Sequence, residues 1–216
     1  MNFAISYSGG KDSALALHRM VTSGHKPVAL ITTVNTLINR SWSHGIDDEL
    51  LLAVSESLKI PLILCQCSAD GYEQAFVRSL EKAREMGADS CVFGDIDIDG
   101  HKAWDEEQCE KAGLNCILPL WKQNREALVR ETLSVGFKAV INVIDCSLLD
   151  DSFLGKDLSA ALVEKIKAAG ADPCGENGEY HTFVYDGPVF SSPISIQTEK
   201  IIDLGAYKAV DIVYKK

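Results

Sequence analysis

The chain has 216 residues, of which 46% are hydrophobic and 24% charged, so it has enough apolar material for a packed core and too few charges for a disordered chain. Its 31 acidic and 21 basic side chains leave a formal net charge of −10, which argues against a protein that holds nucleic acid by neutralising phosphates. No apolar run approaches the roughly 20 residues that span a bilayer, and the short apolar start is too short for a secretory leader, so the sequence predicts a cytoplasmic protein without membrane contact.

Short β-rich apolar runs alternate with amphipathic stretches from the start of the chain. The clearest helix is expected over 72–86, because Phe76, Leu80 and Ala83 recur at helical spacing with charges opposite them. Glycines of the kind that end helices follow such stretches at Gly24, Gly87, Gly113, Gly136 and Gly170. The expected strands, all predicted to be buried and parallel, are 3–7, 28–34, 62–65, 91–93, 116–118 and 139–144.

This alternation predicts an α/β fold with a doubly wound parallel sheet, in which ligands bind beyond the carboxyl ends of the strands. After about Asp145 the pattern gives way to a helix, a polar loop and a strand-rich tail. We therefore expect two domains, a larger one over 1–135 and a smaller C-terminal α/β domain over 136–216.

The seven cysteines are an odd number and lie mostly in apolar stretches. This usage fits reduced thiols better than a disulfide framework. Cys65 and Cys67 form the only close pair, and no second pair with zinc-like spacing follows them, so the sequence gives little support for a metal held by thiols.

The first turn carries a phosphate-binding motif over 8–13, with the sequence SGGKDS, directly after the first strand and at the start of a helix. Two glycines allow a tight turn that points backbone N–H groups at an anion, and the helix N-terminus, two hydroxyls and Lys11 add to this. The motif is no Walker loop, which would need glycine at Ile5 and Ser or Thr at Asp12. An ordinary strand-to-helix turn is the plainer alternative.

The complete hexad in this position resembles the PP-loop of the N-type ATP pyrophosphatases. This resemblance implies cleavage of ATP between the α- and β-phosphates, release of pyrophosphate and an AMP-linked intermediate.

Two further segments follow expected strand ends. His44 lies in a polar loop after the second strand, and Gly94 and Asp95 end the strand at 91–93. A solvated histidine and a turn cap are the plain interpretations of His44 and Asp95. Because the carboxyl ends of parallel strands share one edge of the sheet, we expect instead that these residues complete a nucleotide site.

The densest polar run lies near the C-terminus, over 174–182, with the sequence CGENGEYHT. Within it, Glu179 and His181 would project to the same side of an extended segment and could share a proton. Glu176 supplies a second carboxylate, and the glycines leave room for a substrate. An ordinary polar hairpin has a similar composition.

Together, the hexad and the C-terminal run resemble the diphthine-ammonia ligase family, in which a PP-loop is paired with a Gly-Glu-x-Gly-Glu-Tyr-His-Thr signature. Lys102 departs from the pattern, because an arginine is expected after the histidine. The resemblance spans nearly the whole chain, since segments between the two motifs match in order and spacing at 94–96, His101, Trp104, 119–121 and 186–188.

The resemblance implies an adenine-nucleotide α-hydrolase-like sheet with a C-terminal substrate domain, and an ATP-dependent amide ligase. A carboxylate of the diphthine group on elongation factor 2 would attack the α-phosphorus of ATP, and ammonia would then displace AMP. The residues assigned to the nucleotide are Ser8, Gly9, Gly10, Lys11, Asp12, Ser13, His44, Gly94 and Asp95. The residues assigned to catalysis are Lys11, Asp12, Glu176, Glu179 and His181, with Asp12 also expected to hold Mg²⁺.

Three alternatives stay open. The same chemistry would serve an unidentified small carboxylate in an organism without diphthamide. A PP-loop enzyme that modifies tRNA is disfavoured by the net charge of −10. A nucleotide sensor without catalysis is disfavoured by the cluster of carboxylates and imidazole over 176–181.

Overall fold

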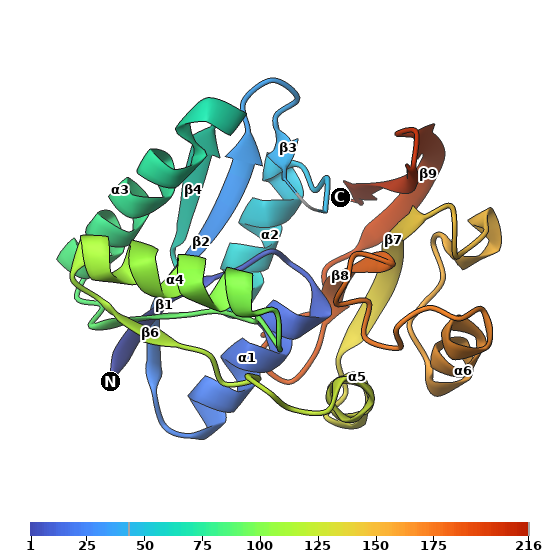
Figure 1. Ribbon diagram of the computed structural model, residues 1–216. Coiled ribbons are helices and arrows are strands. Elements are labelled where there is room, and N and C mark those ends of the chain that lie inside the picture. Colours follow the sequence, from blue (N-terminus) through green and yellow to red (C-terminus); the bar gives the residue numbers. More distant parts are fainter. Residues whose placement is uncertain (43, 216) are drawn as a thin grey trace.

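Five parallel strands form the first of two sheets in the computed structural model, which describes residues 1–42 and 44–215 (Figure 1). Their order is β4-β2-β1-β5-β6, and the short β3 pairs antiparallel with the end of β2. The predicted parallel α/β sheet is thus confirmed. The strands are β1 (Asn2–Ser6), β2 (Lys26–Asn35), β3 (Arg40–Ser41), β4 (Leu62–Cys67), β5 (Ser90–Val92) and β6 (Asn115–Ile117).

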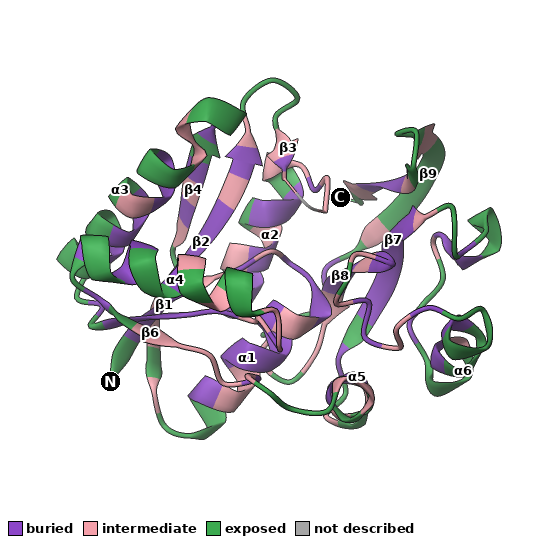
Figure 2. Cartoon of the chain, viewed as in Figure 1, coloured by how far each residue is buried: buried purple, intermediate pink, exposed green. Residues whose placement is uncertain are grey.

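Helices cover both faces of this sheet. Along β1, Phe3 and Ile5 pack in one hydrophobic cluster with α1 and α2, whereas Ala4 between them packs in a second cluster with α3 and α4. Figure 2 shows the buried strands between helices whose outer sides are exposed. The helices are α1 (Lys11–Thr22), α2 (Asp48–Leu58), α3 (Tyr72–Glu85), α4 (Asp99–Ala112), α5 (Arg125–Ser134) and α6 (Ala160–Ala168), with short 3₁₀ turns η1 (Ala69–Gly71) and η2 (Asp151–Phe153).

The order of the strands reverses between β1 and β5. From β1 the chain passes through α1 to β2 on one side, and β5 pairs with the other side of β1. Such a switch point leaves a crevice at the carboxyl ends of the two strands, where α/β proteins bind ligands. The hexad 8–13 follows β1 and Gly94 follows β5, so both expected nucleotide segments lie at this crevice.

The second sheet is antiparallel, in the order β8-β7-β10-β9, and this corrects one prediction. The strand expected over 139–144 is β7, but it pairs antiparallel with β8 and β10 instead of joining the parallel sheet. Six consecutive residues of β7 are buried, so this central strand has the continuous apolar sequence typical of a parallel one. The strands are β7 (Lys138–Asp145), β8 (Tyr180–Asp186), β9 (Ile196–Asp203) and β10 (Tyr207–Tyr214).

A single hydrophobic cluster joins the two sheets, with Leu17 of α1 and Phe183 of β8 among its members. All strands of the second sheet follow residue 136. We keep the division into domains 1–135 and 136–216 as a proposal.

All seven cysteines are free, and no helix in the described part of the chain is long and apolar enough to cross a membrane.

Candidate active site

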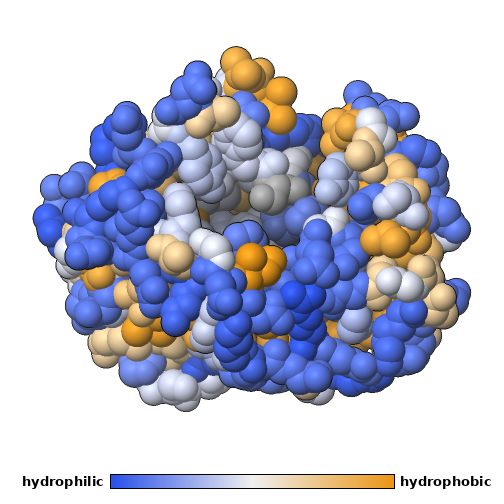
Figure 3. Space-filling model, in the orientation of Figure 1, coloured by the Kyte–Doolittle hydropathy of each residue, from blue (hydrophilic) through white to orange (hydrophobic). Residues whose placement is uncertain are grey.

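A cavity of about 620 Å³ lies at the carboxyl ends of the parallel strands. In Figure 3 the face toward the viewer is hollowed near its centre, with mainly hydrophilic surface around the hollow. Segments from both ends of the chain meet in the cavity. Most of the predicted nucleotide and substrate residues line it, namely Ser8, Lys11, Asp12, Ser13, His44, Gly94, Asp95, Glu176 and His181.

The hexad 8–13 forms the turn between β1 and α1. Gly9 has a φ of 84°, a left-handed conformation that residues with side chains rarely adopt. A Cβ on Gly10 would lie 2.6 Å from Cε1 of His44, so the close approach of this imidazole requires glycine. The two serine hydroxyls of the hexad lie 3.2 Å apart at the start of α1. The turn therefore has the groups of an anion site at a helix N-terminus.

Gly94 packs the end of β5 against the hexad 8–13, which is called the phosphate loop from here on. A Cβ at this position would lie 2.9 Å from the backbone carbon of Asp12 and 2.9 Å from the backbone nitrogen of Ser13. The glycine therefore allows the first turn of α1 to touch the end of β5. The sequence predicts Gly94 in the nucleotide site, and the structure shows that it lines the cavity and also makes this contact within the protein.

Lys11 is a buried cation in the cavity wall. Its side-chain Nζ donates to Asp12 Oδ2 at 2.7 Å and lies 5.3 Å from the centroid of the Tyr180 ring. Burial by itself lowers the pKa of Lys11, but the charge of Asp12 and the surrounding groups outweigh burial and raise this pKa well above its ordinary value. Lys11 therefore stays protonated and offers a fixed positive charge to an anion in the cavity.

Two uncharged imidazoles lie beside the phosphate loop. His44 Nδ1 lies 2.8 Å from the Thr182 carbonyl, which can only accept, so this nitrogen carries the proton. The ring centroids of His44 and His181 are 4.9 Å apart. Burial lowers the pKa of His44 to about 3 and that of His181 to about 4. Both side chains are therefore neutral at physiological pH and can bind uncharged polar atoms.

Glu176 is the carboxylate of the C-terminal run that faces the cavity. Its Oε1 accepts from the backbone N–H of Ile96 at 3.2 Å. Burial raises the pKa of Glu176 to about 7, and the negative charge of Asp12 adds to the effect. A carboxyl group with such a pKa can take up and release a proton near neutral pH.

Glu179 does not line the cavity. Its carboxylate accepts from the backbone N–H of Asp172 at 3.3 Å and from the backbone N–H and side-chain amide of Asn177, each at 3.0 Å. Although burial alone raises the pKa of Glu179, these hydrogen bonds outweigh it and lower the pKa. The predicted pairing with His181 assumed an extended segment, but β8 begins only at Tyr180, so the alternation of sides does not extend back to Glu179.

Sequence reasoning missed Asp105, which is 4% exposed and lines the cavity from α4. Its Oδ2 has no hydrogen-bond partner. Burial and the neighbouring Asp95 raise the pKa of Asp105 to about 9. Burial also raises the pKa of Asp95, whose Oδ1 lies 3.0 Å from His101 Nδ1. The pair therefore holds a proton at neutral pH. The one sequence signal was the i, i+4 spacing of His101 and Asp105, on a helix that starts at a strand end.

Aromatic side chains form one end of the cavity and were also missed as a group. Tyr72, Phe93 and Trp104 line it, and the Tyr72 and Trp104 ring centroids are 5.9 Å apart. Phe76 stands behind them, 5.0 Å from Trp104 between centroids. The cavity wall thus combines the cation of Lys11 with an aromatic wall, formed by Tyr72, Phe93 and Trp104, of the kind that accommodates a planar ring.

Lys102 stands where the family pattern has arginine, and its side chain contacts residues outside the cavity. Its Nζ lies 3.6 Å from Glu106 Oε1 and 5.3 Å from the centroid of the Trp121 ring. Lys102 is not among the described residues that line the cavity. The departure from the pattern therefore leaves the cavity wall intact.

Comparison with known proteins identifies curated relatives that match most of the chain, two of which illustrate the likeness. Diphthine–ammonia ligase of Homo sapiens is 28% identical over 241 residues, which cover 99% of this chain and 90% of the human protein. Its counterpart in Danio rerio is 29% identical over 226 residues, covering 90% of this chain and 86% of the relative.

Among solved structures, the predicted subunit of tRNA methyltransferase from Methanocaldococcus jannaschii has a TM-score of 0.45 and 18% sequence identity, covering 90% of this chain and 100% of its own.

Two protein families match successive parts of the chain. The Diphthamide synthase N-terminal domain matches residues 1–116, and the Diphthamide synthase C-terminal domain matches residues 124–212. The two matches cover the phosphate loop at one end and the Glu176 segment at the other. The protein therefore belongs to the diphthamide synthase family, as a relative of the diphthine–ammonia ligases, and is an ATP-dependent ligase.

Proposed function

We propose that the protein adenylates the carboxylate of diphthine on elongation factor 2 and amidates it with ammonia, releasing AMP and pyrophosphate. One observation carries the proposal. The buried cation Lys11 in the phosphate loop and the carboxyl group of Glu176, from the far end of the chain, line one cavity. The first suits the activation step, and the second suits the amidation step.

In the activation step, the departing pyrophosphate lies in the turn 8–13. Lys11 stabilises the charge that develops on it, and because this side chain is already buried and held by Asp12, no reorganisation is needed. The aromatic wall of Tyr72, Phe93 and Trp104 receives the planar base.

Magnesium fits this site as a cofactor held jointly by protein and substrate. The described residues contain no cluster of three or more His, Cys, Asp or Glu that could hold a metal alone. Mg²⁺ usually binds one or two carboxylates together with substrate phosphates, and Asp12 presents its carboxylate to the cavity beside the phosphate loop. Bound there, the ion would supply further positive charge to the phosphates.

In the amidation step, ammonia attacks the acyl carbon and AMP leaves. The attacking nitrogen must lose a proton as the amide forms, and we assign its uptake to Glu176, which ionises near neutral pH. His44 and His181 are neutral, so they bind polar atoms of the nucleotide or acceptor without repelling an incoming ammonium ion.

Exposed apolar side chains support a protein-borne acceptor over a small acid. Leu37 and Ile38, between β2 and β3, are 84% and 61% exposed, and Leu204, between β9 and β10, is 59% exposed. Figure 3 shows apolar surface on two sides of the hollow, over the β2–β3 connection and toward β9. Exposed apolar surface on both sides of a site is typical of contact with another protein.

The test supplies the purified protein with ATP, ammonium and elongation factor 2 that either carries or lacks diphthine. AMP and pyrophosphate should form only with the diphthine-bearing factor, and the factor should gain an amide. The Asp12→Ala variant is the control and should form no AMP. Equal AMP formation with both forms of the factor, or none with either, would contradict the proposed acceptor.

A further inference from the structure

The segment 172–179, which carries Glu176, connects α6 to β8 as a series of turns without regular secondary structure. A side chain on such a segment needs fixed anchors to hold its place in a cavity. Part of the anchoring is internal, because Asp172 Oδ1 accepts from the backbone N–H of Cys174 at 2.7 Å and Glu179 accepts from two amides of the same segment.

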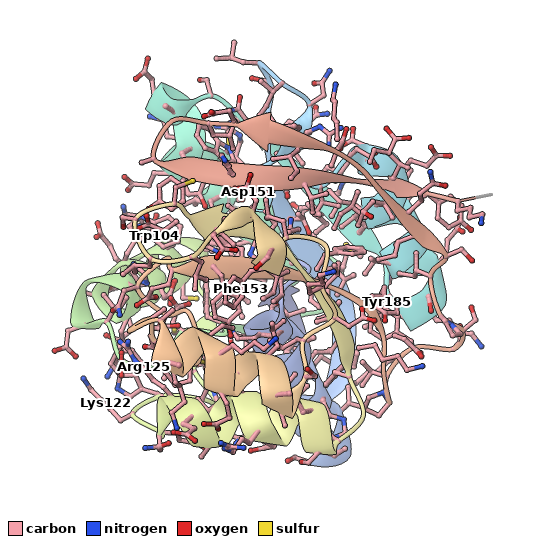
Figure 4. The ribbon with its side chains drawn as sticks, turned by 90° about the vertical axis from the view of Figure 1, so that its right-hand side faces the viewer. Trp104, Lys122, Arg125, Asp151, Phe153 and Tyr185 are labelled. Carbon is pink, nitrogen blue, oxygen red and sulfur yellow. The ribbon has the colours of Figure 1, made fainter. Side chains whose placement is uncertain are left out.

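The charged anchor from outside the segment is Arg125, the first residue of α5, which is labelled in Figure 4; neutral hydrogen bonds from Tyr180 to the Pro173 carbonyl and from Asp145 to the Glu179 carbonyl add to it. Its guanidinium donates two hydrogen bonds to Asp97, from Nε to Oδ2 at 2.9 Å and from Nη2 to Oδ1 at 2.5 Å. Its Nη1 donates to Oδ2 of Asp172. The side chain of Asp172 is only 9% exposed, so this end of the bridge is shielded from solvent.

The two carboxylates held by Arg125 belong to the two loops that meet at Glu176. Asp97 directly follows Ile96, whose N–H donates to Glu176 Oε1, and Asp172 begins the segment that carries Glu176. Arg125 itself does not line the cavity, and together with Asp97, Asp172 and Glu179 it lines a separate surface hollow.

We propose that Arg125 is a positioning residue, which by bridging Asp97 and Asp172 fixes Glu176 opposite the phosphate loop. The role of Glu176 in this proposal rests on the proposed function, whereas the bridge itself does not. Glu179 holds the same segment from within, and this assigns a structural task to a residue that the sequence placed among the catalytic ones.

The geometry requires arginine. A guanidinium presents several N–H donors in one plane and can serve two carboxylates together, whereas the ammonium of a lysine is a point charge on a flexible stem. Arg125→Lys should therefore retain only part of the exchange protection of segment 172–179 and of the AMP-release rate that Arg125→Gln loses.

The matched control is Arg130, on the same helix. It pairs with the half-buried Glu126 and the exposed Glu164, and none of these contacts reaches 172–179. The variants Arg125→Gln, Arg125→Lys and Arg130→Gln are compared by amide hydrogen exchange of segment 172–179, by affinity for ATP and by the rate of AMP formation with the acceptor.

Arg125→Gln should speed exchange in 172–179 by about tenfold, because charge-assisted hydrogen bonds to a loop are lost. It should slow AMP release by about tenfold while ATP affinity stays within about twofold, a split that a general loss of folding would not produce. Arg130→Gln should change none of the three. Asp172→Asn, which keeps the shape of the side chain, should reproduce the Arg125→Gln pattern, and combining the two should add little more.

Unchanged exchange in 172–179, or an equal loss of ATP affinity and turnover, would overturn the proposal. The exchange measurement needs no acceptor. If the unaltered protein formed no AMP with any form of elongation factor 2, the proposed function would fail, while the exchange data would still decide whether Arg125 holds the segment.

Discussion

At the residue scale, two carboxylates three positions apart have opposite environments. Glu176 is half-buried in the cavity, accepts from the backbone N–H of Ile96 and has a raised pKa, whereas Glu179 accepts three hydrogen bonds from its own segment and has a lowered pKa. Opposite shifts in neighbouring acids separate a proton-transferring group from one that stays ionised. We therefore place the base at Glu176.

The pH dependence tests this assignment. The base must be ionised, and because burial raises the pKa of Glu176 to about 7, the amidation rate should rise with pH up to about 7 and level off above it. Glu176→Gln should remove this rise of the rate with pH, the acidic limb of the profile, and lower the amidation rate by about 10²-fold. The rates are measured at a constant concentration of free ammonia, since ammonium itself ionises with pH. A limb that survives in Glu176→Gln would show that another group is the base.

The acid pair Asp95 and Asp105 shows what a sequence does not reveal. Burial raises both pKa values, and the neighbouring Asp95 raises that of Asp105 further; both effects depend on how α4 packs against the end of β5. Asp95 was expected in the site because it follows a strand, whereas Asp105 lies inside a helix with ordinary acidic neighbours. The position of Asp95 in the sequence is enough to predict it in the site, whereas Asp105 is identified only by how its helix packs.

At the scale of elements, the site is built where the first turn of α1 touches the end of β5. Gly94 makes this contact possible, because a Cβ there would meet the α1 backbone at 2.9 Å. Backbone atoms cannot swing aside as the end of a flexible side chain can, so the elements themselves would have to separate.

Gly94→Ala should therefore destabilise the protein by about 1–3 kcal/mol, the usual cost of overpacking, and weaken ATP binding because the phosphate loop moves. Gly71→Ala is the control, since a Cβ there would meet only Ser68 Oγ at an ordinary contact distance of 3.7 Å and Gly71 is not among the described residues that line the cavity. Denaturant unfolding and calorimetric titration with ATP measure the two effects. A Gly94→Ala protein with unaltered stability and affinity would show that this contact does not set the loop.

The elements themselves were largely predictable, because strand and helix periodicities are local. The predicted segments 3–7, 28–34 and 72–86 correspond to β1, β2 and α3. Pairing is not local, and the sequence of β7 is compatible with a parallel or an antiparallel neighbour. Only the partners β8 and β10 decide it, and those lie far along the chain.

At the scale of the whole molecule, the C-terminal sheet holds the turn 8–13 and His44, which the sequence assigns to the nucleotide. The Val184 N–H donates to the Gly9 carbonyl at 2.8 Å, and the Lys11 N–H donates to Thr182 Oγ1 at 3.1 Å. Asn142 of β7 donates to the His44 carbonyl at 2.6 Å. The phosphate loop is thus held by β8, and a ligase that must join a nucleotide to an acceptor has both sites on one rigid support.

The proposed reaction begins when the acceptor carboxylate attacks the α-phosphorus of ATP in this cavity. The most direct measurement uses an acceptor whose carboxylate is labelled with ¹⁸O, followed by mass analysis of the products. Attack at the α-phosphorus predicts that one ¹⁸O atom leaves in AMP when ammonia displaces it. Label found in inorganic phosphate, with ADP as the nucleotide product, would show attack at the γ-phosphorus and contradict the account.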